Sequence, residues 1–106
     1  MELNGKRAII TGGASGFGYG IASHFISEGA KVLIADKNFK LAKEAASNLG
    51  DNAFSFETDV SKLDSLLELQ KEAEKIFDDV EIIVNNAGVT HLPEELEKIS
   101  EEEFDK

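Results

Sequence analysis

A glycine-rich segment near the start of the chain places the strongest constraint on the fold. Residues 11–18 read TGGASGFG, and they follow an apolar run at residues 8–10. An apolar-periodic stretch then begins at residue 21. This order predicts a strand, a glycine turn and a helix. Such a turn places backbone N–H groups and a helix N-terminus where a pyrophosphate can bind.

Strand and helix patterns alternate along the remaining sequence. Strands are predicted at residues 7–11, 31–35, 53–57 and 80–84. Helices are predicted at residues 18–28, from an Asn38 cap to Gly50, and from a capping box of Ser61 and Asp64 through Phe77. The alternation indicates right-handed βαβ units, and therefore an α/β protein with a doubly wound parallel sheet.

The composition excludes several classes of partner. The net charge is −10, with 21 acidic and 11 basic residues, whereas nucleic acids and anionic membranes bind basic surfaces. No apolar run approaches the roughly 20 residues that span a bilayer. There is no cysteine, so disulfide and thiolate chemistry are not expected. A cytoplasmic protein is the prediction, with no metal site, since two distant histidines are a poor ligand set.

The final residues suggest that the sequence belongs to something longer. Residues 93–106 are acidic and resemble a loop that enters a helix at Glu101, with Ser100 and Glu103 as a capping box. About six helical residues cannot form a stable helix alone. Residues 1–106 are therefore expected to be the N-terminal part of a single domain rather than a complete one.

Three glycines of the first turn have distinct expected roles. Gly12 permits the tight exit from the strand, Gly16 allows a phosphate to approach the backbone, and Gly18 allows the helix to pack closely on the sheet. A strict G-x-G-x-x-G is absent, because residue 21 is Ile21. A plain glycine-rich turn without a ligand is the alternative.

An acidic residue at the end of the second predicted strand points to a dinucleotide. Asp36 follows Gly18 by 18 residues, a position from which a carboxylate can bind the ribose hydroxyls of NAD and repel the 2′-phosphate of NADP. Lys37 opposes that preference, because its charge can offset the repulsion. The alternative for Asp36 is a solvated turn residue or a helix cap.

Two further motifs follow the third and fourth predicted strands. Asp59 and Val60 come after the third strand, and the Asn-Asn-Ala-Gly sequence at residues 85–88 ends the fourth. Ligands of doubly wound sheets bind outside the carboxyl ends of strands, where the strand order reverses. Taken alone, the first pair would be a helix-capping acid and its neighbour, and the second an ordinary turn.

Together these motifs resemble the short-chain dehydrogenase/reductase family from Lys6 to Lys106. The resemblance implies a Rossmann-like sheet with strand order 3-2-1-4, NAD as cofactor and hydride transfer between nicotinamide and an alcohol or ketone. It also implies a homo-oligomeric parent enzyme with a small-molecule substrate. The residues that it assigns to the cofactor are Gly12, Ser15, Gly16, Phe17, Gly18, Asp36, Asp59, Val60, Asn86, Ala87 and Gly88.

Within this resemblance, Ser15 lies near the phosphates, and Asp59 with the Val60 amide holds the adenine ring. Asn86 and its neighbours stabilise the sheet and border the adenosine. Phe17 departs from the family, which usually has Ile or Leu there. Its ring could crowd the nicotinamide side of the pocket, but packing beneath the turn as part of the core is the favoured interpretation.

The catalytic residues of the family have no counterpart in the sequence. They are an Asn, a Ser and a Tyr-x-x-x-Lys pair, all expected beyond Lys106, whereas Tyr19 is followed four residues later by Ser23. The chain alone is therefore predicted to be inactive. A non-catalytic dinucleotide-binding module and an inactive fragment are the alternatives.

Two further expectations concern the end of the sequence. Residues 85–106, with Thr90, His91, Leu92 and Pro93, resemble 3-oxoacyl reductases or sugar dehydrogenases. In the order 3-2-1-4 the strand at 80–84 is an edge, so the isolated chain is expected to self-associate there.

Overall fold

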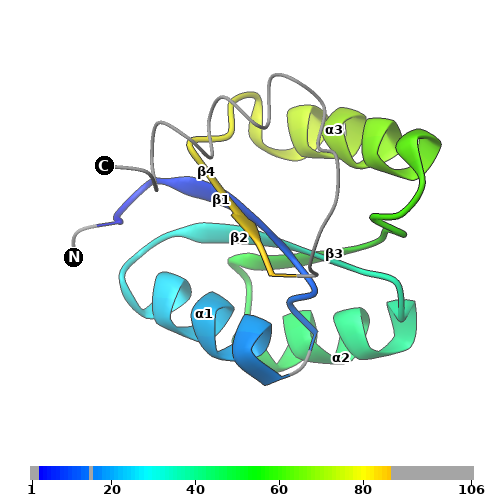
Figure 1. The fold of residues 1–106 in the computed structure, drawn as a ribbon. Coiled ribbons are helices and arrows are strands. Elements are labelled where there is room, and N and C mark those ends of the chain that lie inside the picture. The colour runs from blue at the N-terminus through cyan, green and yellow to red at the C-terminus, as the bar shows by residue number, and fades with distance from the viewer. Residues whose placement is uncertain (1–2, 15, 87–106) are drawn as a thin grey trace.

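The computed structural model describes residues 3–14 and 16–86. The described elements are β1 (Arg7–Thr11), α1 (Gly16–Ser27), β2 (Lys31–Asp36), α2 (Phe39–Leu49), β3 (Ala53–Glu57), α3 (Leu63–Phe77) and β4 (Ile82–Asn85). The strands form one parallel sheet in the order β3-β2-β1-β4. Helices α1 and α2 cover one face of this sheet and α3 covers the other (Figure 1). The predicted doubly wound, Rossmann-like architecture is confirmed.

Two apolar layers hold the sheet between its helices. The central strands β1 and β2 have apolar side chains on both faces, as expected of strands that are covered on both sides. Ile10 and Ile34 pack with Ala22 and Ala42, which are small residues of α1 and α2. Toward α3 the layer is made of larger side chains, namely Ile9, Leu33, Leu66, Leu69, Phe77 and Ile83. Small residues therefore let α1 and α2 approach the sheet closely.

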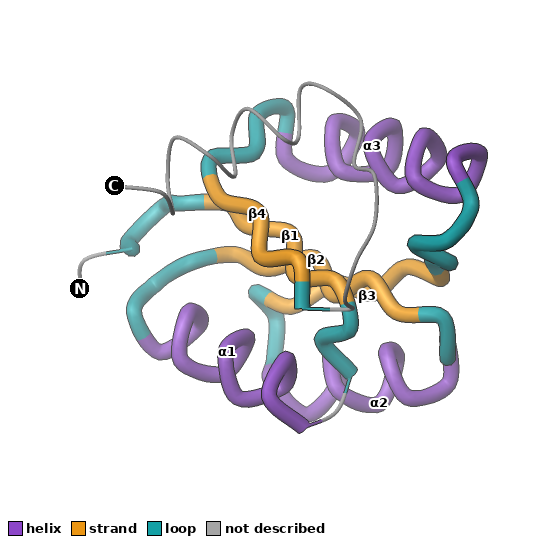
Figure 2. Tube along the Cα trace, in the orientation of Figure 1, coloured by secondary structure: helices purple, strands orange, loops and turns teal. Residues whose placement is uncertain are grey.

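The parallel arrangement brings the carboxyl ends of all four strands to one edge. Thr11 is in register with Ala35 on β2 and with Asn85 on β4, and Asp36 is in register with Glu57 on β3. The loops that follow β1, β2 and β3 therefore begin at this same edge, and Figure 2 draws their described residues in teal. The predicted motifs of the first three strands lie in these loops or at their start.

Element boundaries differ from the predictions by one or two residues. Helix α1 begins at Gly16 rather than at residue 18, β2 extends to Asp36, and β4 begins at Ile82 rather than at residue 80. The predicted Asn38 cap is confirmed, because its side chain accepts a hydrogen bond from Leu41 N at 3.1 Å. The helix predicted from Glu101 lies outside the described residues.

The predicted capping box of Ser61 and Asp64 is wrong. Helix α3 has Lys62 at its N-cap, and that residue makes no side-chain capping bond. The Ser61 hydroxyl instead donates to Asp59 Oδ1 at 2.6 Å, and the Ser61 N–H donates to the same oxygen at 3.0 Å. The Asp59 carboxylate thus closes a turn around Ser61 before the helix begins, so the hydroxyl does not serve the helix.

Strand β4 is an edge of the described sheet, where β1 is its only partner among residues 3–14 and 16–86. Ile82 and Ile83 are buried against opposite faces. The edge therefore presents backbone rather than apolar side chains, and self-association through it stays a prediction.

No helix in the described part of the chain is long and apolar enough to cross a bilayer. The cytoplasmic location also stays a prediction.

Candidate functional site

The turn between β1 and α1 has the backbone geometry of an anion site. Gly12 and Gly16 have φ angles of +66° and +59°, in the region that glycine enters without a steric penalty. Helix α1 begins at Gly16, and its first turn contains no acidic residue. The positive end of the helix dipole is therefore not offset by a side chain of that turn, and its N–H groups can receive an anion.

Gly18 permits a close approach between α1 and the ends of two strands. A Cβ atom at this position would collide with the carbonyl oxygen of Gly12 and would lie 2.7 Å from Asn86 Nδ2. The Asn86 side chain lies beside that position and donates from Nδ2 to Gly12 O at 3.2 Å. The residue after β4 thus braces the turn after β1, which supports the predicted packing role of Gly18.

Asp36 lies at the end of β2 and contacts the same turn. Its Oδ2 accepts a hydrogen bond from Ala14 N at 3.1 Å, and its Oδ1 accepts one from Asn38 N at 3.0 Å. The carboxylate is half-buried. These two bonds fix its position, while the remaining lone pairs of the carboxylate oxygens can still accept bonds from a ligand.

Asp59 is held by the two serines that follow it. Ser61 bonds to Oδ1 through its hydroxyl and its N–H, and Ser65 Oγ accepts from Asp59 N at 2.8 Å. The Ser61 hydroxyl bond, then the Ser61 amide and the charges of Lys37 and Lys62, lower the pKa of the Asp59 carboxyl. Asp59 is therefore an ionised acceptor at neutral pH, and its Oδ2 receives no hydrogen bond from the described residues.

A cleft of about 160 Å³ joins three of these loops. It is lined by Gly12, Ala35, Asp36, Lys37, Thr58, Asp59 and Val60. Four predicted cofactor residues therefore meet in one space, namely Gly12, Asp36, Asp59 and Val60. The predicted residues Ser15, Ala87 and Gly88, together with His91, lie outside the described residues.

The interpretation of Phe17 as core is wrong. Its side chain is 82% exposed, and with Gly20, Ile21, His24 and Phe25 it lines an apolar groove on α1. The reason is the early start of α1. Phe17 lies in the first helical turn, one position before Gly18, and Gly18 and Ala22 form the stripe that faces the sheet.

Three residues of the site were missed in the sequence. Thr58 lines the cleft, while Ser61 and Ser65 brace Asp59. The pattern of Asp followed two residues later by Ser is typical of a side-chain-closed turn and could have identified Ser61. Nothing local in the sequence marks Ser65, because its hydroxyl bonds backward across six residues.

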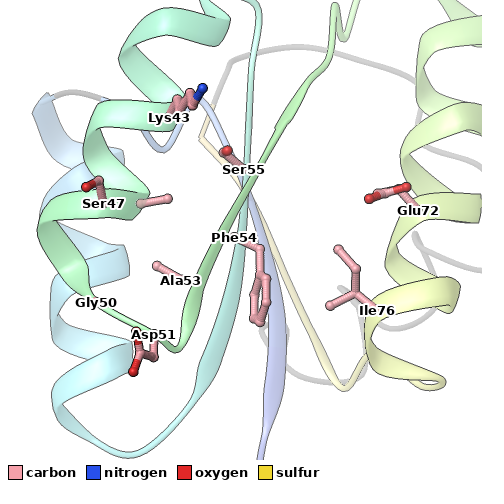
Figure 3. Close-up of a pocket in the computed structure, with 10 residues that line it drawn as sticks. Lys43, Ser47, Gly50, Asp51, Ala53, Phe54, Ser55, Glu72 and Ile76 are labelled. Carbon is pink, nitrogen blue, oxygen red and sulfur yellow. The ribbon is translucent and has the colours of Figure 1, made fainter.

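A larger hollow of about 580 Å³ lies beside β3 and is separate from this cleft. Lys43 and Ser47 of α2 stand on one side of it and Glu72 of α3 stands on the other, with Ser55 of β3 between them (Figure 3). None of the predicted cofactor residues lines it. The motifs of the sequence therefore identify the smaller cleft, at the carboxyl edge, as the candidate site.

Comparison with known proteins identifies a family that this chain matches. Residues 6–106 match the short chain dehydrogenase family. The chain is 38% identical over 106 residues to an uncharacterised oxidoreductase of Mycobacterium bovis, covering 98% of this chain and 42% of that protein. It is 37% identical over 106 residues to galactitol 2-dehydrogenase of Agrobacterium fabrum, covering 100% of this chain and 41% of that protein.

A solved structure has the same fold. The 3-ketoacyl-(acyl-carrier-protein) reductase of Brucella melitensis, complexed with NADH, has a TM-score of 0.80 and 43% identity, and the match covers 97% of this chain and 42% of that one. The chain thus spans about two fifths of the length of these relatives.

Proposed function

The chain belongs to the short-chain dehydrogenase family, and from this premise we propose that it forms the NAD-binding part of an oxidoreductase. The whole protein would transfer hydride between nicotinamide and the carbinol or carbonyl carbon of a small molecule. NAD supplies the hydride-accepting carbon when it is bound, and the protein supplies binding, orientation and electrostatics.

The observation that carries this proposal is the cleft at the carboxyl edge. It joins the glycine turn to Asp36 on one side and to Asp59 with Val60 on the other. In the proposed complex the pyrophosphate lies at the N-terminus of α1, the adenosine ribose at Asp36 and the adenine ring at Asp59. The open backbone at Gly16, where an added Cβ would meet no atom within 4 Å, fits a phosphate that approaches closely.

Asp36 supports NAD rather than NADP. Its carboxylate is fixed by Ala14 N and Asn38 N, so it cannot withdraw from a 2′-phosphate without breaking both bonds. Lys37 lines the same cleft and opposes the repulsion. Lys37 is exposed, however, whereas Asp36 is half-buried, and solvent screens the charge of the lysine more strongly.

We expect the chain by itself to bind NAD without turnover. Its single tyrosine, Tyr19, lies in α1 and packs against the apolar layer beneath the sheet. That tyrosine is therefore poorly placed to act as the acid/base of the family. For the whole enzyme, the relatives named for galactitol and for 3-ketoacyl substrates favour a sugar alcohol or a 3-oxoacyl compound.

A titration of NADH and NADPH into the chain tests the cofactor assignment. We expect NADH to bind more tightly than NADPH. Asp36→Ala should weaken NADH binding about tenfold, because a charge-assisted hydrogen bond is lost. It should also reduce the difference in affinity between NADH and NADPH, because the repulsion of the 2′-phosphate is lost. Asp51→Ala removes an exposed carboxylate that lies outside the cleft and should change neither affinity.

Absence of NADH binding to the wild-type chain would contradict the proposed function itself. Equal affinity for the two cofactors would contradict the assigned preference but not the site. Alcohol oxidation by the pure chain above background would show that it carries its own acid/base, contrary to the proposal.

A further inference from the structure

Thr58 carries a buried hydroxyl that has no hydrogen-bond partner in the described part of the chain. The residue follows β3 directly and is 1% exposed. Its Oγ1 is the buried side-chain polar atom that finds no partner among the described residues. The backbone is fixed meanwhile, since Thr58 N donates to Asp36 O at 2.9 Å. Because the backbone of Thr58 is held in place, a shift of the end of β3 does not explain why its hydroxyl lacks a partner.

The other buried threonine shows what a satisfied hydroxyl looks like in this fold. Thr11 is 0% exposed, and its Oγ1 donates toward Asn85 Oδ1 at 3.0 Å and Val84 O at 3.3 Å. Buried polar groups of native proteins have partners, and an exception calls for a ligand or an ordered water. Thr58 is such an exception, and it lines the cleft that Asp36 and Asp59 enclose.

We propose that the Thr58 hydroxyl hydrogen-bonds the adenosine part of the bound dinucleotide. This inference rests on the proposed function and adds a residue that the sequence motifs do not include. Thr58 lies in the chain immediately before Asp59, and its N–H bonds the last residue of β2. It is thus placed between the group assigned to the ribose and the group assigned to the adenine.

The chemistry of a hydroxyl complements that of its neighbours. The carboxylates of Asp36 and Asp59 accept hydrogen bonds, whereas a threonine hydroxyl donates one and accepts others. The ring nitrogens of adenine and the ring oxygen of ribose are acceptors, which these carboxylates cannot serve. Thr58 therefore supplies the donor that the two acids lack.

The test compares Thr58→Val with Thr58→Ser and uses Thr11→Val as the matched control. ADP-ribose is the probe, because it contains the adenosine but no nicotinamide. We expect Thr58→Val to weaken ADP-ribose binding about threefold to tenfold, the effect of one lost hydrogen bond. The thermal midpoint of the free chain should not fall, because the variant removes an unpaired group. Thr58→Ser should keep the affinity.

The control separates this role from a structural one. Thr11→Val removes a hydroxyl that has partners, so it should lower the thermal midpoint of the free chain. A Thr58→Val variant that is less stable and binds ADP-ribose as the wild type does would overturn the inference, since the hydroxyl would then serve an internal or water partner. Equal loss of affinity in Thr58→Ser and Thr58→Val would also overturn it.

A measurement on the unaltered chain covers the case in which Thr58→Val does not fold. With ¹³C-labelled threonine methyl groups, ADP-ribose should shift the Thr58 methyl resonance more than that of Thr11. An unshifted Thr58 resonance at saturating ADP-ribose would reject the inference. A wild-type chain that binds neither NADH nor ADP-ribose would instead reject the proposed function.

Discussion

The β1–α1 turn and the β3–α3 turn deliver groups to the same cleft, but the first is shaped by glycine backbone and the second by side-chain hydrogen bonds. In the first turn, Gly12 and Gly16 adopt positive φ angles and Gly18 leaves room for the Gly12 carbonyl. In the second, Ser61 closes a turn on the Asp59 carboxylate and Ser65 accepts the Asp59 N–H. The two loops follow β1 and β3, which lie on either side of β2 in one parallel sheet.

The difference decides how each turn responds to substitution. A glycine that touches backbone cannot acquire a Cβ unless the main chain moves, so its replacement has a large effect. A serine in a partly exposed turn contributes one hydrogen bond, which water can replace in part. A substitution at Gly18 in the first turn should therefore lower the free energy of unfolding strongly, whereas a substitution of a serine in the second turn should lower it less.

The largest expected effect is that of Gly18→Ala. The new methyl group would meet the Gly12 carbonyl oxygen and the Asn86 side chain, so α1 or the turn must shift. We expect the free energy of unfolding to fall by about 2–3 kcal/mol and NADH binding to be lost at concentrations that saturate the wild type. Chemical denaturation and a fluorescence titration measure the two effects.

Gly20→Ala is the matched control on the same helix. A Cβ at Gly20 meets no atom within 4 Å, so the higher helix propensity of alanine should stabilise the chain by about 0.5–1 kcal/mol. If Gly18→Ala also raised the free energy of unfolding, the close contact at Gly18 would not shape the first turn. The proposed difference between the two turns would then be wrong.

A middle-sized effect is expected from Ser65→Ala in the second turn. The variant leaves the partly buried Asp59 N–H without its acceptor, which lies at 2.8 Å. We expect the free energy of unfolding to fall by about 1 kcal/mol, measured by urea denaturation. Ser47→Ala, an exposed position on α2, should change it by less than about 0.5 kcal/mol. Equal values for the two variants would show that the Ser65 bond does not hold the turn.

The same difference explains which parts of the molecule the sequence could predict. The strands and the first turn were predictable, because buried parallel strands are continuous apolar runs and glycines mark the turn directly. The strand order 3-2-1-4 came from the resemblance to the family rather than from these patterns. Ser61 was misread because it fits two patterns, a capping box with Asp64 three residues later and an Asx turn with Asp59 two residues earlier. Its partner is decided by the Asp59 carboxylate, which a local pattern does not place.

Three other residues, Phe17, Asp36 and Thr58, depend on packing that no local pattern contains. Phe17 was assigned to the core, but the start of α1 at Gly16 turns it outward, and a shift of two residues in a helix start is beyond what sequence signals resolve. Asp36 was predicted as a ribose ligand, yet its bond to Ala14 N depends on how the turn folds back over β2. The unpaired hydroxyl of Thr58 likewise became visible only once its burial was known.

The smallest effect, and the one that reports most directly on the second turn, is a change in the pKa of Asp59 in Ser61→Ala. The Ser61 hydroxyl is the largest cause of the lowered pKa of the Asp59 carboxyl, so its loss should raise that pKa toward the ordinary aspartate range. The rise should be partial, because the Ser61 amide, Lys37 and Lys62 still favour the ionised form. A ¹³C NMR titration of the Asp59 carboxyl carbon measures it, with Ser61→Thr as the variant that keeps a hydroxyl.

The sign of the accompanying change in stability follows from linkage. The Asp59 carboxyl of the folded chain has a lower pKa than that of the unfolded chain, so it stabilises the fold above the unfolded pKa and loses this contribution as the pH falls through the folded pKa. In Ser61→Ala the folded and unfolded pKa values of Asp59 lie closer together. The Asp59 carboxylate therefore contributes less to the free energy of unfolding at neutral pH, and this contribution is fully lost at a higher pH than in the wild type. An Asp59 pKa that is unchanged in Ser61→Ala would mean that the hydroxyl does not shape this turn, and the second turn would then have to be explained by Ser65 and the backbone alone.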